Sequence, residues 1–193
     1  MVGLTGGLGA GKSAALAALE RLGAEVISTD QVVHELYESA EVRDQVVDRW
    51  GPGVLGNGGR VDRSAVAARA FADDRERAWL EGVLWPRVGA RVNAWRERVL
   101  AMAQPPVAAV VETPLLFESG MDAAYDATIA VVADEAVRAE RAGLRGHHAV
   151  AERERRQLSQ EEKARRATYV VHNDGSLADL ERELSEVLVK LNG

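Results

Sequence analysis

Cysteine is absent from this sequence of 193 residues. Structural disulfides, thiolate metal sites and cysteine nucleophiles are therefore excluded. Long apolar runs are missing too, so we expect no membrane-spanning helix and no membrane partner. The chain enters a short apolar segment directly, with no basic stretch or cleavage site before it. These absences favour a cytoplasmic protein.

Positive charge is scarce overall and concentrated in one place. The net charge is −6, and only three of the 24 basic residues are lysines. Nucleic-acid binders usually present a basic face, so nucleic acid is not an expected partner. Between residues 138 and 166, however, the sequence is rich in arginine.

The most informative stretch is a glycine-rich motif near the start. Residues 6–13 fit the phosphate-binding pattern G-x-x-x-x-G-K-[ST] without a mismatch. Glycines let successive backbone N–H groups point into one concavity, Lys12 can reach the β and γ phosphates, and the Ser13 hydroxyl can ligate Mg²⁺. The residues expected to contact a nucleotide here are Gly7, Leu8, Gly9, Ala10, Gly11, Lys12, Ser13 and Ala14.

Short apolar segments alternate with helical patterns along the chain. This alternation predicts an α/β fold with three layers, in which helices cover both faces of a five-stranded parallel sheet. The last helix carries an apolar stripe that we expect in the core, formed by Leu177, Leu180, Leu184, Val187, Leu188 and Leu191. The five predicted strands are residues 2–5, 24–28, 107–112, 127–133 and 168–171.

A helical insert separates the second strand from the third. Its glycine-rich tract at residues 51–59 is predicted to be a turn between helices. Asp62 can cap the helix after it, either Asp73 or Asp74 the next, and Pro86 suits the first turn of another. Trp79, Trp85 and Trp95 are expected to pack against neighbouring helices.

Asp30 follows the second predicted strand closely. Ligands of open α/β sheets sit beyond the carboxyl ends of the strands, which would put Asp30 near the phosphate loop. Asp30 can equally be a cap for the helix that starts at Gln31. The residues alone leave both interpretations open.

Taken in order, the motifs resemble those of the dephospho-coenzyme A kinases, a family of P-loop nucleotide kinases, over nearly the whole chain. The phosphate loop is common to many families, whereas Pro-Leu-Leu-Phe-Glu at a strand end is much more restrictive. The matching segments are residues 4–13, 26–30, 58–63, 114–118, 153–157 and 169–175, with Phe71, Leu80 and the pair Arg141 and Arg145.

The resemblance implies transfer of the γ-phosphate of ATP to the ribose 3′-hydroxyl of dephospho-coenzyme A, the last step of coenzyme A synthesis. It implies that Asp30 is the catalytic aspartate, which accepts or orients the hydroxyl proton. Lys12 would stabilise charge on the phosphates, which Mg²⁺ would bridge from Ser13. Arg141 and Arg145 would close over the transferring group.

The same resemblance assigns the remaining contacts and the parts of the chain. Arg153, Asn173 and Gly175 would lie near the adenine of ATP. The core would comprise residues 1–30, 105–135 and 168–193, with an acceptor-binding region at 31–104 and an arginine-rich lid at 136–167. A monomer is favoured. The expected contacts with dephospho-coenzyme A are Thr5, Asp30, Arg63, Pro114, Leu115 and Leu116.

The chain departs from the family pattern in a few places. Trp85 precedes Pro86 where the family usually has histidine, and Gly146 follows Arg145 where aspartate is normal. Glu112 stands where aspartate is frequent, which suggests a water-mediated role at the metal.

Two rival functions remain. Another small-molecule kinase, of the nucleoside or shikimate type, is possible because the insert decides the acceptor. An NTPase switch is disfavoured, because the sequence has no Asn-Lys-x-Asp motif and its one Asp-x-x-Gly run follows a predicted helix.

Overall fold

The computed structural model of the chain describes residues 1–143 and 157–193, with side chains up to residue 141 and from residue 157. The chain forms two compact units. The first consists of Met1–Ser28 and Trp95–Gly193, and the second of Thr29–Ala94. Within the described residues, no helix combines the length and the apolar character needed to cross a membrane.

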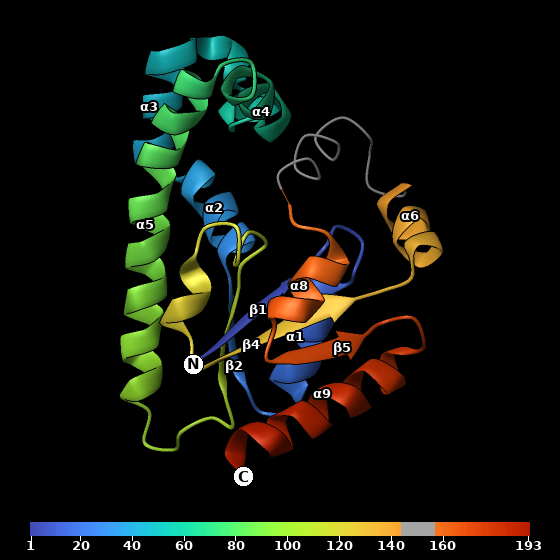
Figure 1. Ribbon diagram of the computed structural model, residues 1–193. Helices are drawn as coiled ribbons and strands as arrows, with labels where there is room; N and C mark the ends of the chain where they lie inside the picture. The colour runs from blue at the N-terminus through green and yellow to red at the C-terminus, as the bar shows by residue number, and fades with distance from the viewer. Residues whose placement is uncertain (144–156) are drawn as a thin grey trace. The chain divides into compact units, whose positions relative to one another are not determined.

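The first unit is built on five parallel strands in the order β2-β3-β1-β4-β5 (Figure 1). β1 lies in the middle, where Leu4 pairs with Glu112 on one side and with Ile129 on the other. The predicted α/β fold with a five-stranded parallel sheet is therefore confirmed. The strands are β1 (Val2–Gly6), β2 (Glu25–Ser28), β3 (Ala109–Glu112), β4 (Ala127–Val132) and β5 (Tyr169–His172).

The central strands are mostly apolar because both of their faces are covered. Every residue of β1 and β4 is buried, as is typical of parallel strands between two helical layers. Side chains alternate along a strand, so Val2 and Leu4 enter the main core cluster while Thr5 faces the other way. Thr5 thus reaches the second face of the sheet at the carboxyl end of its central strand.

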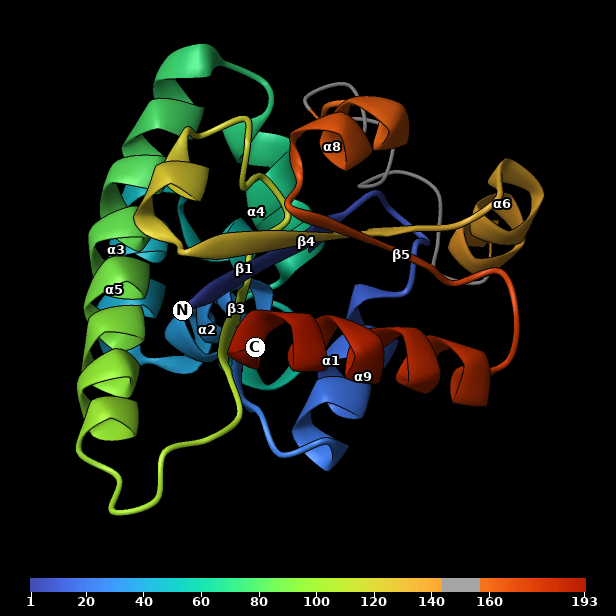
Figure 2. The same cartoon turned by 60° about the horizontal axis from the view of Figure 1, so that its bottom comes forward.

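Helices cover the two faces of this sheet. Figure 2 shows α1 (Lys12–Arg21) and α9 (Leu177–Asn192) side by side on one face, and α8 (Gln160–Arg166) on the other. A further helix, α6 (Glu135–Gly143), follows β4, and the short helical turn η3 (Met121–Ala124) precedes β4. The sheet is consequently the middle of three layers.

The apolar stripe of α9 is mostly core, as predicted. Leu180, Leu184, Val187 and Leu188 are buried against α1 and the sheet. The prediction was wrong for Leu177, which is 64% exposed. Leu177 is the first residue of the helix, one turn before the buried part begins, so its side chain lies beyond the packed surface.

The second unit is helical. Its glycine-rich tract forms the turns η1 (Pro52–Val54) and η2 (Asn57–Gly59), as predicted for a connection between helices. Asp62 accepts hydrogen bonds from Ser64 N and Ala65 N at the start of α4, which confirms its predicted cap. The helices are α2 (Thr29–Glu38), α3 (Ala40–Trp50), α4 (Arg63–Ala70) and α5 (Asp74–Leu100), the last of which continues into the first unit.

Two predictions about α5 were wrong. Pro86 does not begin a helix but lies inside α5. A proline ring presses on the carbonyl four residues earlier, here that of Gly82, where no neighbouring atom lies within 4 Å of a Cβ position, so the backbone has room to adjust. Trp85 is 60% exposed and so is not packed, unlike Trp95, which is buried, and Trp79, whose ring meets that of Trp50 edge-on at 5.0 Å.

The N-terminus of α9 provides a test of the fold by pH. Hydrogen bonds from Ser176 and Arg182 to the carboxylate lower the pKa of Asp179 from 3.8 to about 2. A carboxyl whose pKa is lowered in the folded state stabilises the fold above its unfolded pKa, and the contribution is lost as the pH falls through the folded pKa. We expect Asp179→Asn to lower the urea midpoint at neutral pH, with the deficit shrinking between about pH 4 and pH 2.

Urea unfolding followed by circular dichroism across this pH range measures the effect. Glu186→Gln, which changes an exposed carboxylate of the same helix, is the matched control and should leave the midpoint unchanged. A deficit in Asp179→Asn that stays constant down to about pH 2 would contradict the assigned pKa shift.

Candidate active site

The phosphate loop connects the buried strand β1 to the start of α1. Gly9 and Gly11 have left-handed backbone angles, with φ of 75° and 94°. A Cβ atom on Gly9 would lie 2.6 Å from the carbonyl oxygen of Arg138, and one on Gly11 would lie 1.9 Å from Nδ2 of Asn173. Both positions therefore require glycine for backbone conformation and for space.

The start of α1 is suited to an anion. The first N–H groups of a helix have no partner within the helix, and a side chain at the N-cap often satisfies them. The N-cap of α1 is Gly11, which has no side chain to offer. The start of α1 thus lacks a side-chain cap, and the positive end of its dipole favours a phosphate there.

Lys12 and Ser13 lie in the first turn of α1, at the mouth of this loop. The Lys12 ammonium donates to the carbonyl oxygens of Gly6 at 3.0 Å and Gly7 at 3.2 Å, so it lies over the loop. Ser13 is exposed. The structure thereby brings together the loop residues that the sequence predicted, Gly7, Leu8, Gly9, Ala10, Gly11, Lys12, Ser13 and Ala14.

Asn173 and Arg141 join the loop from the far end of the chain. The buried Asn173 side chain donates from Nδ2 to the carbonyl of Ala10 at 2.8 Å. Arg141 on α6 donates to the backbone oxygen of Asn173 at 3.0 Å. Gly175 lies apart from these contacts, at the start of α9, where a Cβ would come within 2.9 Å of Oδ2 of Asp179.

Arg145 and Arg153 fall outside the described residues. Their predicted roles at the lid and near the adenine stay predictions.

Arg138 also contacts the phosphate loop, although the sequence alone did not indicate it as a candidate residue. Its Nε donates to the carbonyl of Leu8 at 2.9 Å, and its guanidinium lies 3.3 Å from the Cβ position of Gly7. The spacing to Arg141 is the signal that could have revealed it, because residues three apart share one face of a helix. The two arginines of α6 thus hold the loop and Asn173 together.

The predicted acceptor contacts Thr5, Pro114, Leu115 and Leu116 meet where β1 and β3 end. The Thr5 hydroxyl donates to the carbonyl of Pro114 at 3.2 Å, and Thr5 is fully buried. Leu116 is also fully buried in this structure. A buried lysine, Lys163, donates to the same Pro114 carbonyl and was likewise missed from the sequence.

Glu112 and Ser28 end the two neighbouring strands β3 and β2. Glu112 is buried and accepts a hydrogen bond of 2.5 Å from the Ser28 hydroxyl. Asp30 lies two residues further, in the first turn of α2. Because α2 already begins at Thr29, Asp30 is not the residue that precedes the helix, as a simple cap would be.

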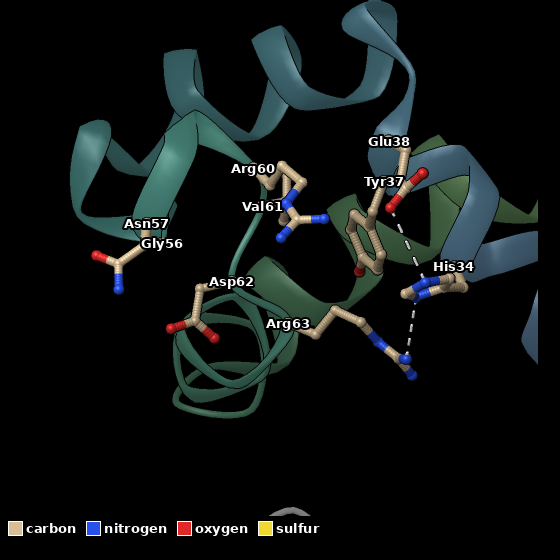
Figure 3. Close-up of a pocket in the computed structure, with 9 residues that line it drawn as sticks. All are labelled: His34, Tyr37, Glu38, Gly56, Asn57, Arg60, Val61, Asp62 and Arg63. Carbon is tan, nitrogen blue, oxygen red and sulfur yellow. Dashed lines mark hydrogen bonds and ion pairs between the residues drawn. The ribbon is translucent and has the colours of Figure 1, made fainter.

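The second unit contains a cavity of about 410 Å³ (Figure 3). Arg63 contributes its guanidinium, which lies 3.3 Å from Nδ1 of His34. His34 in turn lies 4.0 Å from the carboxylate of Glu38. The nine lining residues are His34, Tyr37, Glu38, Gly56, Asn57, Arg60, Val61, Asp62 and Arg63.

Comparison with known proteins places the chain in a family. A family model described as dephospho-CoA kinase matches residues 1–179. The chain belongs to the dephospho-CoA kinase family. Dephospho-CoA kinases from Deinococcus radiodurans and Thermus thermophilus are 39% and 38% identical to it, over 98% and 100% of this chain and 91% and 92% of their own lengths.

Solved structures share the fold of this chain. A crystal structure from Thermus thermophilus matches with a TM-score of 0.81 at 35% identity, covering 100% of this chain and 97% of that one. A dephospho-CoA kinase from Campylobacter jejuni shares the fold, with a TM-score of 0.67 at 24% identity and coverage of 98% and 96%.

The family, the fold class and the activity predicted from the sequence are confirmed. The chain is a phosphotransferase of an ATP-dependent kinase family that functions in coenzyme A biosynthesis. The family match decides against both the other small-molecule kinases and the NTPase switch.

Gly9 gives a direct test of the loop. Gly9→Ala adds a side chain at φ 75° and places it against the backbone of Arg138, so the loop must move. Strain of about 1–3 kcal/mol at such a position corresponds to about tenfold or more in affinity. We expect the dissociation constant for ATP, measured by calorimetry, to rise by about that factor.

The matched control is Gly23→Ala. Gly23 also has a positive φ, 89°, but lies away from the loop and has no neighbour nearer than 3.8 Å to its Cβ position. This control should cost stability and leave ATP affinity unchanged. Equal losses of ATP affinity in the two variants would show that backbone strain in general, not the packing of the loop, causes the effect.

Proposed function

We propose that the chain transfers the γ-phosphoryl group of ATP to the ribose 3′-hydroxyl of dephospho-CoA, with Lys12, Asp30 and Arg141 as the principal catalytic residues. The observation that carries this proposal is the phosphate loop, in which Gly9 and Gly11 leave no room for a side chain and whose helix begins without a side-chain cap. Such a loop is built for polyphosphate.

On the donor side, the backbone N–H groups of the loop would bind the β and γ phosphates. Lys12 would exchange the carbonyl oxygens of Gly6 and Gly7 for charged phosphate oxygens, which are the stronger acceptors. Arg141 would turn its fork of donors toward the transferring group, aided by Arg145. Asn173 would keep its contact with the loop beside the adenine, near Arg153.

On the acceptor side, Asp30 would accept the proton of the 3′-hydroxyl. The hydroxyl oxygen forms a bond to the γ-phosphorus while the bond from that phosphorus to the bridging oxygen breaks, and ADP leaves with the electron pair. A positioned carboxylate is sufficient for this step, because the transition state is loose and catalysis depends mostly on placement and charge. Its place in the first turn of α2, directly after β2, supports this role.

The residues present fit a magnesium ion. Ser13 offers a hard oxygen ligand in the first turn of α1, and the described residues contain no cluster of three or more histidines or carboxylates that would hold a metal by themselves. Mg²⁺ commonly binds in this way, through few protein ligands, several waters and the phosphates of the substrate. When bound, it would neutralise charge on the β and γ oxygens. Glu112, held by Ser28, would act on it through water.

For the acceptor, we propose that residues 31–104 bind dephospho-CoA, with 136–167 as the lid and the remaining segments as the core of a monomer. The cavity around Arg63 supports this assignment, because Arg60 and Arg63 can donate to phosphate oxygens. At the strand ends, Thr5 and the backbone of residues 114–116 would contact the acceptor.

The choice of acceptor is tested by product analysis. ATP, Mg²⁺ and the enzyme are incubated separately with dephospho-CoA, adenosine, uridine or shikimate, and the products are weighed by mass spectrometry. We expect coenzyme A and ADP from dephospho-CoA and no phosphorylated product from the other three. Failure to phosphorylate dephospho-CoA would overturn the proposal.

Asp30→Asn tests the base. The amide cannot take the proton, so we expect turnover to fall by about 10² or more while ATP affinity changes little. Glu186→Gln, which changes an exposed acid of α9 outside the proposed acceptor-binding region, is the control and should keep wild-type turnover. Near-normal turnover of Asp30→Asn would remove Asp30 from the catalytic step.

Lys12→Ala tests the charge on the donor side. Loss of one preorganised donor to developing charge should raise the barrier by about 3 kcal/mol, measured as kcat/KM. Lys190→Ala removes an exposed lysine of α9 and serves as the control. An increase below about 1 kcal/mol would mean that Lys12 does not stabilise the transferring phosphate.

A further inference from the structure

Lys163 on α8 is a charged side chain with no exposed surface. Its Nζ lies 3.3 Å from the Thr5 hydroxyl, 2.6 Å from the carbonyl of Pro114 and 3.0 Å from Oε1 of Glu118. An ammonium group has three N–H donors, so each has one oxygen to bind. The charge is therefore fully engaged inside the protein.

These oxygens belong to two separate strand ends. Thr5 immediately precedes the phosphate loop in β1, whereas Pro114 and Glu118 lie in the segment that follows β3. The same two ends are also joined by the bond from the Thr5 hydroxyl to Pro114 and by one from Thr113 N to the carbonyl of Leu4, at 2.9 Å. Lys163 thus connects the end of β1, next to the phosphate loop, to residues 114–118.

Helix α8 is itself firmly held. The Gln160 side chain binds both backbone groups of Ala133, with its Nε2 at 2.8 Å from the carbonyl and its Oε1 at 2.9 Å from the N–H. Just before the helix, Leu158 N donates to Oε1 of Glu118 at 2.8 Å. The base of the Lys163 side chain cannot shift without breaking these contacts.

The buried ion pair of Lys163 and Glu118 is not well explained by a contribution to the stability of the fold. Burial lowers the pKa of Lys163, and the carboxylates of Glu118 and Glu112 oppose that shift. Replacing a buried ion pair by apolar residues of similar volume often leaves a protein as stable or more stable. Moreover, Oε2 of Glu118 is buried and has no hydrogen-bond partner among residues 1–143 and 157–193.

We propose that Lys163 is a positioning residue for the acceptor. It holds residues 114–118 against the end of β1, so that the backbone that contacts dephospho-CoA keeps a fixed place beside the phosphate loop. This inference rests on the proposed function, which assigns Thr5 and residues 114–116 to acceptor binding.

The deciding variant is the double substitution Lys163→Met with Glu118→Gln. Lys163→Met alone leaves the Glu118 carboxylate unpaired, which is destabilising for a reason unrelated to positioning. In the double variant both charges are gone, and the amide introduced by Glu118→Gln still offers an oxygen to Leu158 N. We expect the melting temperature of the double variant to equal or exceed that of Lys163→Met.

In steady-state kinetics, we expect KM for dephospho-CoA to be about tenfold or more higher in the double variant and kcat to be lower. The reason is that a small displacement of the backbone that positions a substrate reduces both its binding and its reaction rate. Its dissociation constant for ATP should stay near that of the wild type. Lys190→Met, an exposed lysine on α9, is the matched control and should change none of these values. Wild-type KM and kcat in the double variant would overturn the proposal. A loss of ATP affinity as large as the rise in KM for dephospho-CoA would also overturn it, as would failure of both Lys163 variants to fold.

Hydrogen exchange separates this inference from the proposed function. The amides of Thr113 and of residues 115–118 should exchange faster in the double variant than in the wild type, whichever acceptor the enzyme uses. If the wild type fails to phosphorylate dephospho-CoA, the proposed function fails while faster exchange still identifies Lys163 as the anchor of this segment. Unchanged exchange would show that Lys163 does not hold it.

Discussion

The backbone N–H groups at the start of α1, which the N-cap Gly11 cannot satisfy with a side chain, are the feature on which the site depends. A helix that begins without a side-chain cap favours an anion, because its first N–H groups and the positive end of its dipole lie there. Two side chains from distant segments donate hydrogen bonds to carbonyl groups of the loop. Arg138 binds the carbonyl of Leu8, and Asn173 binds that of Ala10. These two bonds fix the carbonyl groups of the loop just before the start of α1.

The buried polar residues follow the same geometry. Among the described residues these are Thr5, Glu112, Thr113, Thr128, Lys163 and Asn173. All except Thr128 lie at the carboxyl ends of strands or bind to them from α8. A buried polar group costs free energy unless it is hydrogen-bonded, so such groups gather where fixed positions matter. Ligands of parallel sheets bind at this same edge.

Phosphoryl transfer suits a site of this kind, because the reaction asks the protein mainly for placement and for stabilisation of charge. Lys12 and the loop amides provide charge from the first turn of α1, while on α6 Arg138 binds the loop and Arg141 binds Asn173. The loop alone would fit many kinases. The match of residues 1–179 to the dephospho-CoA kinase family is what implies dephospho-CoA as the acceptor.

The sequence by itself determined the phosphate loop, the five strands, the cap at Asp62 and the family, because each depends on local spacing or on residue types a few positions apart. Only the tertiary structure decided that Pro86 lies within a helix, that Trp85 is exposed, that Arg138 binds the phosphate loop, and that Lys163 binds Thr5 and Pro114. Lys163 shows the reason most clearly. Its partner Thr5 lies 158 residues away in the chain, and no local pattern records which distant segments will pack together.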